Sequence, residues 1–424
     1  MAGRRRSRSR IHTSDDDDGA TRPSRRRRRR RAEVPVPLPD GGGTLQESLQ
    51  GDSGPPPAPS ESLPLPLDML WKILLLLPPK PSSRLRASAV SRRWRGIATD
   101  PNFKSQFHVH RRNCKPPPIL GLFVRRWKME FRQGFLHPSD RVPAERFSIP
   151  SRYDIRGCRH GRVLAVHREY AKLLVFAPLS GEVCTLSVPD EFRPPSCFRL
   201  NGAVLCDAND HGHVHGMCHL SPFKVVLLSK FSMEDRFITS VYSSRSKKWS
   251  VVVSKEAPCS VDSDVPAILV NNRLYWLLSS KARGLLEFDL DRQSLTVIKW
   301  PTGMIDSGSH GIIKTEEGAV GLVRFSFPSL EIWQRKINQG VATWLDPKIV
   351  DMHNVLGIPR QIGRRSWPSS LRGYAEDGNV IILYVDDSAY MVDLNSMKST
   401  KLDGSRSMNR CHPFTSFYPP DMAI

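Results

Sequence analysis

The chain has 424 residues, and 63 Lys and Arg against 42 Asp and Glu give it a formal net charge of +21. This length allows two domains with tails. Its eight cysteines form no Cys-x-x-Cys pair and no small-domain disulfide framework, and since no secretory signal is present we expect reduced thiols.

Residues 1–62 have the composition of a disordered tail. They combine an unbroken arginine run, Arg25–Arg31, with four consecutive aspartates, Asp15–Asp18, and with Pro-, Gly- and Ser-rich sequence. The arginine run is typical of a nuclear import signal or a nucleic-acid contact, and equally of a solvated tail that carries no targeting signal. No apolar stretch of the secretory kind is present, and the aspartates argue against a transit peptide. We therefore expect a protein of the nucleus and/or cytoplasm.

The first predicted helix follows Leu65. Pro66 and Asp68 favour a helix start, and Pro78-Pro79 ends it. Apart from Asp68, Lys72 is its only polar residue, so its apolar surface extends almost all the way round and needs cover on more than one side. A membrane span would need about 20 apolar residues. The run is too short and contains Lys72, so we reject that interpretation.

A second helical stretch, capped by Ser82 or Ser83, is expected to end at Asp100-Pro101. Two or three short helices in about forty residues are close to the lower size limit for independent folding, so a partner is expected to complete the core. Its apolar residues recur at helical spacing with arginines between them: Leu85, Ala89, Val90, Trp94 and Ile97.

This stretch resembles the F-box, whose pattern is roughly Leu-Pro-x-Asp-hydrophobic-Leu-x-x-Ile-Leu-x-x-Leu-Pro and later Arg-x-x-x-Val-Ser-x-x-Trp-Arg. Lys72 and Pro81 depart from the usual Glu and Ser without removing an apolar anchor; the alternative is an ordinary helical hairpin. The resemblance implies docking on a Skp-family adaptor through Leu65, Pro66, Leu70, Ile73, Leu74 and Leu77, with Val90 and Trp94 packing the module and Trp94 reaching the adaptor's rim. The matching residues are Leu65, Pro66, Asp68, Leu70, Ile73, Leu74, Leu77, Pro78, Arg86, Val90, Ser91, Trp94 and Arg95.

Beyond residue 118 the pattern changes to the alternation typical of strands. We divide the chain into a tail at 1–62, a helical domain at 63–112, a Pro-rich linker at 113–118 and an all-β domain at 119–424. The fold class is thus multidomain, α then predominantly antiparallel β.

A weak repeat runs through the β domain. Phe176, Tyr242, Phe288 and Val392 each have an apolar residue ten positions on, and Leu330–Arg335 is a similar unit. Spacings of about 45 to 65 residues are typical of four-stranded propeller blades, and we expect about six blades. The domain lacks Trp-Asp and kelch signatures. It resembles the F-box-associated, propeller-like domain of plant F-box proteins, whose hairpin motifs are matched by Tyr242 to Trp249 and Glu287 to Leu290.

One loop is rich in metal-ligand residue types. Zinc would use His213 and His215 from one strand face, with Cys218 and His219 completing a tetrahedron. Because this spacing matches no familiar closed site, we expect ordinary polar residues in a loop and no metal. The whole group is Asp207, Asp210, His211, His213, His215, Cys218 and His219.

No catalytic motif of the hydrolase, phosphate-loop, zinc-protease or dinucleotide-binding type is present, and we expect neither catalysis nor a cofactor. The F-box resemblance implies a substrate-recognition subunit of an SCF-type cullin-RING ubiquitin ligase. It would bind a Skp-family adaptor, and through it a cullin, while the β domain holds a protein target. The alternative is a nucleic-acid-binding protein that uses the arginine-rich tail. No membrane association is expected.

Overall fold

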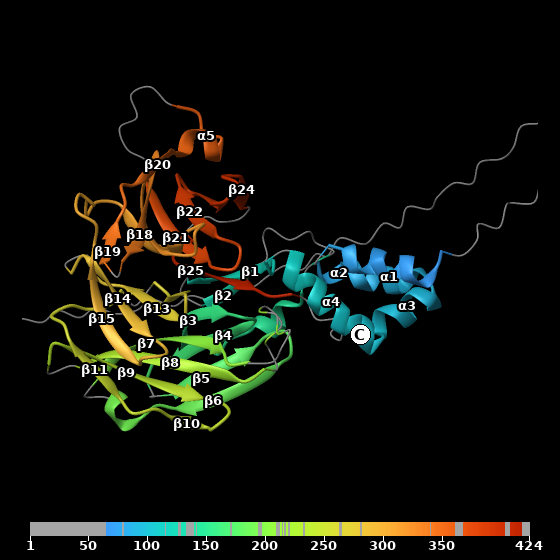
Figure 1. The fold of residues 1–424 in the computed structure, drawn as a ribbon, viewed down its shortest axis with the longest axis horizontal. Coiled ribbons are helices and arrows are strands. Elements are labelled where there is room, and N and C mark those ends of the chain that lie inside the picture. Colours follow the sequence, from blue (N-terminus) through green and yellow to red (C-terminus); the bar gives the residue numbers. More distant parts are fainter. Residues whose placement is uncertain are drawn as a thin grey trace, which may run out of the picture. The chain divides into compact units, whose positions relative to one another are not determined.

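The computed structural model describes residues 65–417, apart from short gaps at 79, 115, 126–128, 133–139, 141, 170–171, 194–196, 209–212, 214, 216–217, 219–220, 232–233, 263–264, 280–281, 340, 361–367 and 403–407. The chain divides into two units, and the second, Pro64–Ile424, contains every element described below (Figure 1). The expected disordered tail at 1–62, with its arginine run, lies outside the described residues.

The helical module contains four helices: α1 (Leu67–Leu76), α2 (Pro81–Val90), α3 (Arg92–Thr99) and α4 (Pro101–Cys114). The expected second helix is interrupted at Ser91, whose backbone is extended and whose hydroxyl accepts the Trp94 amide N–H at 3.3 Å. Val-Ser-x-x-Trp is therefore a helix start, not part of one helix. The predicted cap at Ser82 or Ser83 is wrong, since α2 begins at Pro81 with no side-chain cap.

Asp100 separates the last two helices, as expected, and also starts the final one. Its carboxylate accepts the amide N–H groups of Asn102 and Phe103 at 2.7 and 3.2 Å. The core of the module is small because each helix is short. It is formed by Leu70, Leu74, Ala87, Ile97, Phe103 and Phe107, with Trp71, Leu75, Leu77 and Trp94 packed against it.

Five antiparallel sheets of four or five strands make up most of the β domain. We call each of these sheets a blade. The first and second blades contain β3 (Tyr153–Arg159), β4 (Arg162–His167), β5 (Lys172–Ala177) and β6 (Glu182–Ser187), and then β7 (Cys197–Cys206), β8 (Phe223–Phe231), β9 (Arg236–Ser243), β10 (Lys248–Trp249) and β11 (Val253–Glu256). The third contains β12 (Ile268–Val270), β13 (Arg273–Leu277), β14 (Gly284–Asp289) and β15 (Ser294–Lys299), and the fourth contains β16 (Ser309–Lys314), β17 (Val320–Ser326), β18 (Ser329–Asn338), β19 (Val341–Trp344) and β20 (Lys348–Asp351), followed by α5 (Met352–Leu356). The fifth contains β21 (Ser369–Ala375), β22 (Val380–Val385), β23 (Ser388–Asp393) and β24 (Ser399–Leu402).

A three-stranded sheet joins the two ends of the β domain. Strand β1 (Ile119–Arg125) pairs on one side with β2 (Met129–Arg132) and on the other with the last strand, β25 (Cys411–Thr415). The expectation of about six blades is therefore corrected to five. The remaining strands come from both ends of the domain, and the first, β1, is hydrogen-bonded to the last, β25, which closes the domain.

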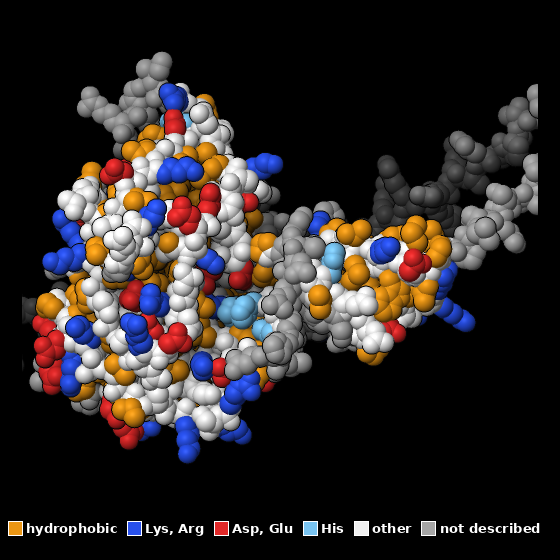
Figure 2. All heavy atoms as spheres, viewed as in Figure 1, with side chains coloured by type: hydrophobic (Ala, Val, Ile, Leu, Met, Phe, Trp, Pro, Cys, Tyr) orange, Lys and Arg blue, Asp and Glu red, His pale blue; other side chains and the backbone are white. Residues whose placement is uncertain are grey.

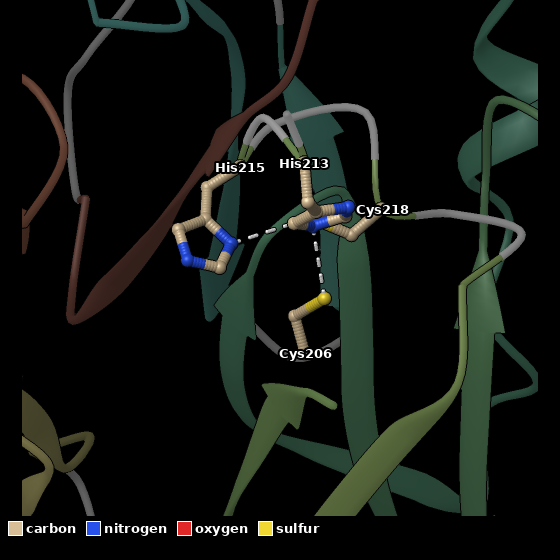
Figure 3. Close-up of side chains that lie close together, drawn as sticks. All are labelled: Cys206, His213, His215 and Cys218. Carbon is tan, nitrogen blue, oxygen red and sulfur yellow. Dashed lines mark hydrogen bonds between the residues drawn. The ribbon is translucent and has the colours of Figure 1, made fainter. Parts of the chain in front are cut away.

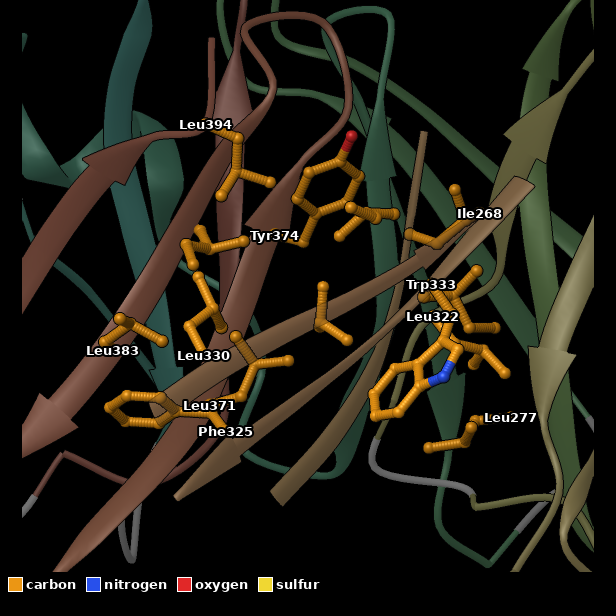
Figure 4. Packing of buried hydrophobic residues seen from close by; sticks show 14 of the residues in the cluster. Ile268, Leu277, Leu322, Phe325, Leu330, Trp333, Leu371, Tyr374, Leu383 and Leu394 are labelled. Carbon is orange, nitrogen blue, oxygen red and sulfur yellow. The ribbon is translucent and has the colours of Figure 1, made fainter. Parts of the chain in front are cut away.

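Apolar side chains fill the spaces between consecutive sheets. One cluster joins the third, fourth and fifth blades, and Figure 4 shows Leu277, Leu322 and Leu383 from these three sheets pointing into it. Other clusters join the first blade to the second, the second to the third, and the closing sheet to the first and fifth blades. Each sheet is thus buried on both faces, which explains strands such as β4 with little polar alternation.

In the part of the chain that the structure describes, no helix combines the length and the apolar character that crossing a membrane requires.

Candidate functional site

Helix α1 has two apolar faces with different environments. Leu70 and Leu74, four residues apart, are 2% and 1% exposed in the module's core. Met69, Ile73 and Leu76 recur at spacings of four and three on another face and are 45%, 37% and 72% exposed. The space-filling view shows hydrophobic side chains gathered over the helical module (Figure 2). The module thus leaves an apolar face of α1 uncovered.

The expected adaptor-facing residues divide between these environments. Leu65, Pro66 and Ile73 are exposed and available to a partner, whereas Leu77 is partly buried against the core. Leu70 and Leu74 instead pack inward against the other helices of the module, and their contact with an adaptor stays a prediction.

The two residues expected to pack the module also differ. Trp94 packs partly against the core, as expected. Val90 is 64% exposed at the end of α2, because the chain turns away at Ser91, so its packing role is corrected. Exposed apolar residues that sequence reasoning did not assign to the surface are Leu67, Met69, Leu76 and Leu85. The sequence feature that could have indicated the exposure of Leu67, Met69 and Leu76 was the nearly all-apolar circumference of α1.

A second group of functional side chains lies in the second blade. Cys206 is the last residue of β7, and His213, His215 and Cys218 come from the connection to β8. One potential ligand atom from each of the four lies within 4.8 Å of the others. The Nε2 atom of His213 is 3.1 Å from the Cys206 sulfur and 3.2 Å from the Cys218 sulfur, and Nδ1 of His215 is 3.5 Å from the latter (Figure 3).

This Cys-His cluster differs from the group considered in the sequence. Cys206 was missed, because it belongs to a strand and only the fold brings it to the loop. Asp207 is near in sequence, but its carboxylate forms ion pairs with Lys224 at 2.8 Å and Arg245 at 3.4 Å. The other members of that group, Asp210, His211 and His219, lie outside the described residues.

The turn between β3 and β4 supports the cluster. Nδ1 of His160 accepts the Cys206 amide N–H at 3.2 Å, and the His160 ring stacks on His215 with centroids 4.1 Å apart. Burial lowers the pKa of His160 well below its usual value, which favours the neutral ring. A hydrogen bond with Cys218 lowers the pKa of Cys206 to about 4.

A cavity of about 220 Å³ adjoins the cluster, and its lining includes His160, Cys206 and His215. The Cys-His cluster brings two sulfur and two nitrogen atoms that could bind a metal ion close together. Among the described residues whose side chains are placed, five cysteines are free thiols: Cys158, Cys184, Cys206, Cys259 and Cys411. The Cys218 sulfur lies against ring nitrogens of His213 and His215.

Comparison with known proteins identifies the helical module. A family model described as the F-box domain matches residues 63–106. No protein of the curated set matches the chain.

Several solved structures share limited similarity. The extracellular domain of a one component system from B. thetaiotaomicron is 11% identical with a TM-score of 0.31, over 60% of this chain and 28% of that one. A chain of a nidogen/laminin complex is 12% identical with a TM-score of 0.35, over 69% and 96%. The Malassezia sympodialis allergen Mala s 1 is 12% identical with a TM-score of 0.34, over 60% and 83%. The chain spans little more than a quarter of the first of these. Scores at this level carry no information about the activity of this chain.

The F-box match and the observed sheets agree with the domain order expected from the sequence. The chain contains an F-box domain at residues 63–106, followed by a mostly antiparallel β domain with a propeller arrangement of five blades.

Proposed function

We propose that this chain is a substrate-recognition subunit of an SCF-type cullin-RING ubiquitin ligase. Its F-box binds a Skp-family adaptor and through it a cullin, and its β domain binds a protein target. The observation that carries the proposal is the uncovered apolar face of α1, Met69, Ile73 and Leu76, within the F-box match. The likeness of the β domain to the F-box-associated domain of plant F-box proteins belongs to the same proposal.

The energetic argument rests on the difference between the two faces of α1. Removing an aliphatic side chain of this size from water contributes about 1.5 to 3 kcal/mol. Three such residues on one helix face are enough to anchor a helix in the groove of a partner. Without a partner these residues stay exposed to water, because the core of the module is too small to cover them.

The chain's role in the ligase is one of proximity. A bound target has a high effective concentration near the ubiquitin-transferring subunits, so this chain needs no catalytic group of its own. Loops surrounding a rigid blade scaffold suit the target site. We place this function in the nucleus and/or cytoplasm, and imaging a tagged chain with and without Arg25–Arg31 tests the location. The expected alternative, nucleic-acid binding by the arginine run, rests on residues outside the described part and is not proposed here.

The decisive experiment compares adaptor binding by full-length variants. Ile73→Glu with Leu76→Glu places two charges on the uncovered face without entering the core, and we expect at least a 100-fold weaker complex because buried unpaired charges are costly. Val251→Glu is the matched control, since Val251 is 85% exposed in the β domain. Affinity is measured by pull-down and calorimetry with a purified Skp-family adaptor.

The result distinguishes the uncovered face from a general effect of added charge. Retained tight binding in the Ile73 and Leu76 variant would contradict the proposal, and so would equal weakening by Val251→Glu. The circular dichroism of each variant, compared with that of the unaltered chain, shows whether the fold is preserved. Truncating Leu70 or Leu74 does not serve this purpose, because both belong to the core of the module.

A further inference from the structure

We propose that Cys206, His213, His215 and Cys218 bind one Zn²⁺ ion in a closed tetrahedral site. The site lies in the second blade of the β domain and is separate from the adaptor-binding face. It departs from the expectation, based on the sequence alone, that this loop holds no metal.

The distances between the ligand atoms fit a zinc tetrahedron. With Zn–S of about 2.3 Å and Zn–N of about 2.0 to 2.1 Å, the edges of a tetrahedron are about 3.3 to 3.8 Å. Sulfur–nitrogen distances of 3.1, 3.2 and 3.5 Å among these side chains are close to this range, and all four ligand atoms lie within 4.8 Å of one another. The three sulfur–nitrogen edges need to change by only a few tenths of an ångström, and the other edges would shorten from at most 4.8 Å as the side chains close around the ion.

The ligand types select the metal. Two thiolates and two imidazoles form the Cys₂His₂ set of structural zinc sites, whereas Ca²⁺ and Mg²⁺ prefer oxygen ligands. With all four positions taken by the protein, no site remains for water or substrate, so the ion stabilises structure. Two thiolates also balance the charge of the ion, which suits a place where Cys218 is fully buried.

A disulfide between Cys206 and Cys218 is the competing use of the two thiols. It would leave unexplained why both imidazoles present a ring nitrogen within 3.5 Å of a cysteine sulfur. The support from His160 also fits metal binding, because it holds the backbone of one ligand and stacks on the ring of another.

The consequence for the fold lies in the connection between β7 and β8. This connection runs from residue 207 to residue 222, and its described residues belong to no named helix or strand. Zinc would fasten three points of it to the end of β7 and thereby lower the conformational entropy it can gain on opening. The rim of the second blade next to the 220 Å³ cavity would be held in one shape.

Metal analysis of the full-length protein, purified without chelator under reducing conditions, is the first test. Inductively coupled plasma mass spectrometry should find one zinc per chain in the unaltered protein. Cys206→Ser and His213→Ala should each lose most of it, whereas the matched control Cys259→Ser, which alters a partly buried thiol outside the cluster, should retain it. Cobalt exchanged into the site should give the intense visible bands of a tetrahedral ion with thiolate ligands.

A second readout does not depend on the folding of the variants. A strong chelator should lower the melting temperature of the unaltered chain and of Cys259→Ser, and added Zn²⁺ should restore it. The proposal is overturned if the unaltered protein holds no zinc after incubation with Zn²⁺, or if Cys206→Ser keeps a full equivalent. Peptide mapping that finds a Cys206–Cys218 disulfide in the reduced preparation also overturns it.

Discussion

In the helical module the apolar residues Leu67, Met69 and Leu76 are between 45% and 72% exposed, whereas in the β domain Leu322, Phe325 and Leu330 are completely buried between sheets. The β domain also has exposed apolar residues, among them Val183 on β6, Ile349 on β20 and Val251 between β10 and β11. Scattered residues of this kind are normal for a protein surface. A helix with a whole apolar face in water is the arrangement expected of a module that is completed by a partner.

Among the described residues, the β domain also differs from the helical module in that it contains a buried ion pair. Arg159, at the end of β3, is 7% exposed and pairs with Glu376 of the β21–β22 turn. The same guanidinium donates to the carbonyls of Ala267 at 2.8 Å and Val204 at 3.3 Å, and Glu376 accepts the Leu269 amide N–H. One buried ion pair therefore ties together the first, second, third and fifth blades. In the helical module the buried core is apolar, and Arg84 of α2 donates to the Ala98 carbonyl of α3.

The largest expected effect comes from breaking this ion pair. Glu376→Ala leaves a buried guanidinium without its carboxylate, and we expect the free energy of unfolding to fall by about 3 to 5 kcal/mol. Denaturation of the purified variant measures the loss. Arg159→Met combined with Glu376→Leu removes both charges and should recover much of the stability. A loss below about 1 kcal/mol in the single variant would show that the blades do not depend on this link.

Within the helical module, a buried and an exposed leucine of the same helix should behave oppositely. Leu74→Ala should cost about 2 to 5 kcal/mol, because it opens a cavity in a core of six buried residues. Leu76→Ala should change stability by less than about 0.5 kcal/mol and instead weaken adaptor binding. Hydrogen exchange of the α1 and α4 amides reports the stability. Equal protection in the two variants would contradict the two-faced description of α1.

Two tryptophans join outer strands of neighbouring blades and give a smaller effect. The Trp249 indole N–H donates to the Ser187 carbonyl at 3.1 Å, and that of Trp344 donates to the Lys299 carbonyl at 2.9 Å. Trp→Phe at either position should cost about 0.5 to 1.5 kcal/mol. The two losses should add, because the sites join different blade pairs. Chemical denaturation tests both points, and costs that fail to add would indicate that the blades respond as one body.

The repeat seen in the sequence corresponds to one strand of each blade. Phe176, Tyr242, Phe288 and Val392 lie in β5, β9, β14 and β23, and Leu330–Arg335 lies in β18. These are the third strands of the five blades, so the number of repeat units in the sequence already equalled the number of blades. The expectation of about six was wrong because strands from both ends of the domain form the closing sheet, which no local repeat announces.

The F-box shows where composition stops being informative. The apolar circumference of the first helix predicted a need for cover on more than one side. The structure covers the side of Leu70 and Leu74 and leaves Met69, Ile73 and Leu76 exposed, so cover of that second side stays a prediction. The sequence pattern did not assign Leu70 and Leu74 to the inner face, since that depends on where α3 and α4 pack. Cys206 was missed for a related reason: a strand residue and a loop residue become neighbours only through the fold.

The smallest predicted effect concerns Asp289, within the Glu287 to Leu290 motif. Its carboxylate accepts the backbone N–H groups of Arg292 at 2.9 Å and Asp291 at 3.0 Å, and the Arg273 side chain at 3.0 Å. The Arg292 N–H is the main cause that lowers the pKa of Asp289 below its usual 3.8, against the opposing effect of burial. A lowered folded-state pKa means that its contribution is full above the unfolded value and is lost as the pH falls through the folded value.

Asp289→Asn isolates this contribution, because the amide oxygen still accepts the turn's N–H groups but no longer titrates. We expect the variant to be less stable near neutral pH by about 1 kcal/mol, since the charged hydrogen bonds are the stronger ones. The difference should shrink as the pH falls from about 5 toward 3. Denaturation curves of both proteins across this range measure it. A difference that stays constant with pH would mean that the turn depends on the shape of the side chain and not on its charge, which would leave the Arg159–Glu376 pair as the better-supported charged link in the β domain.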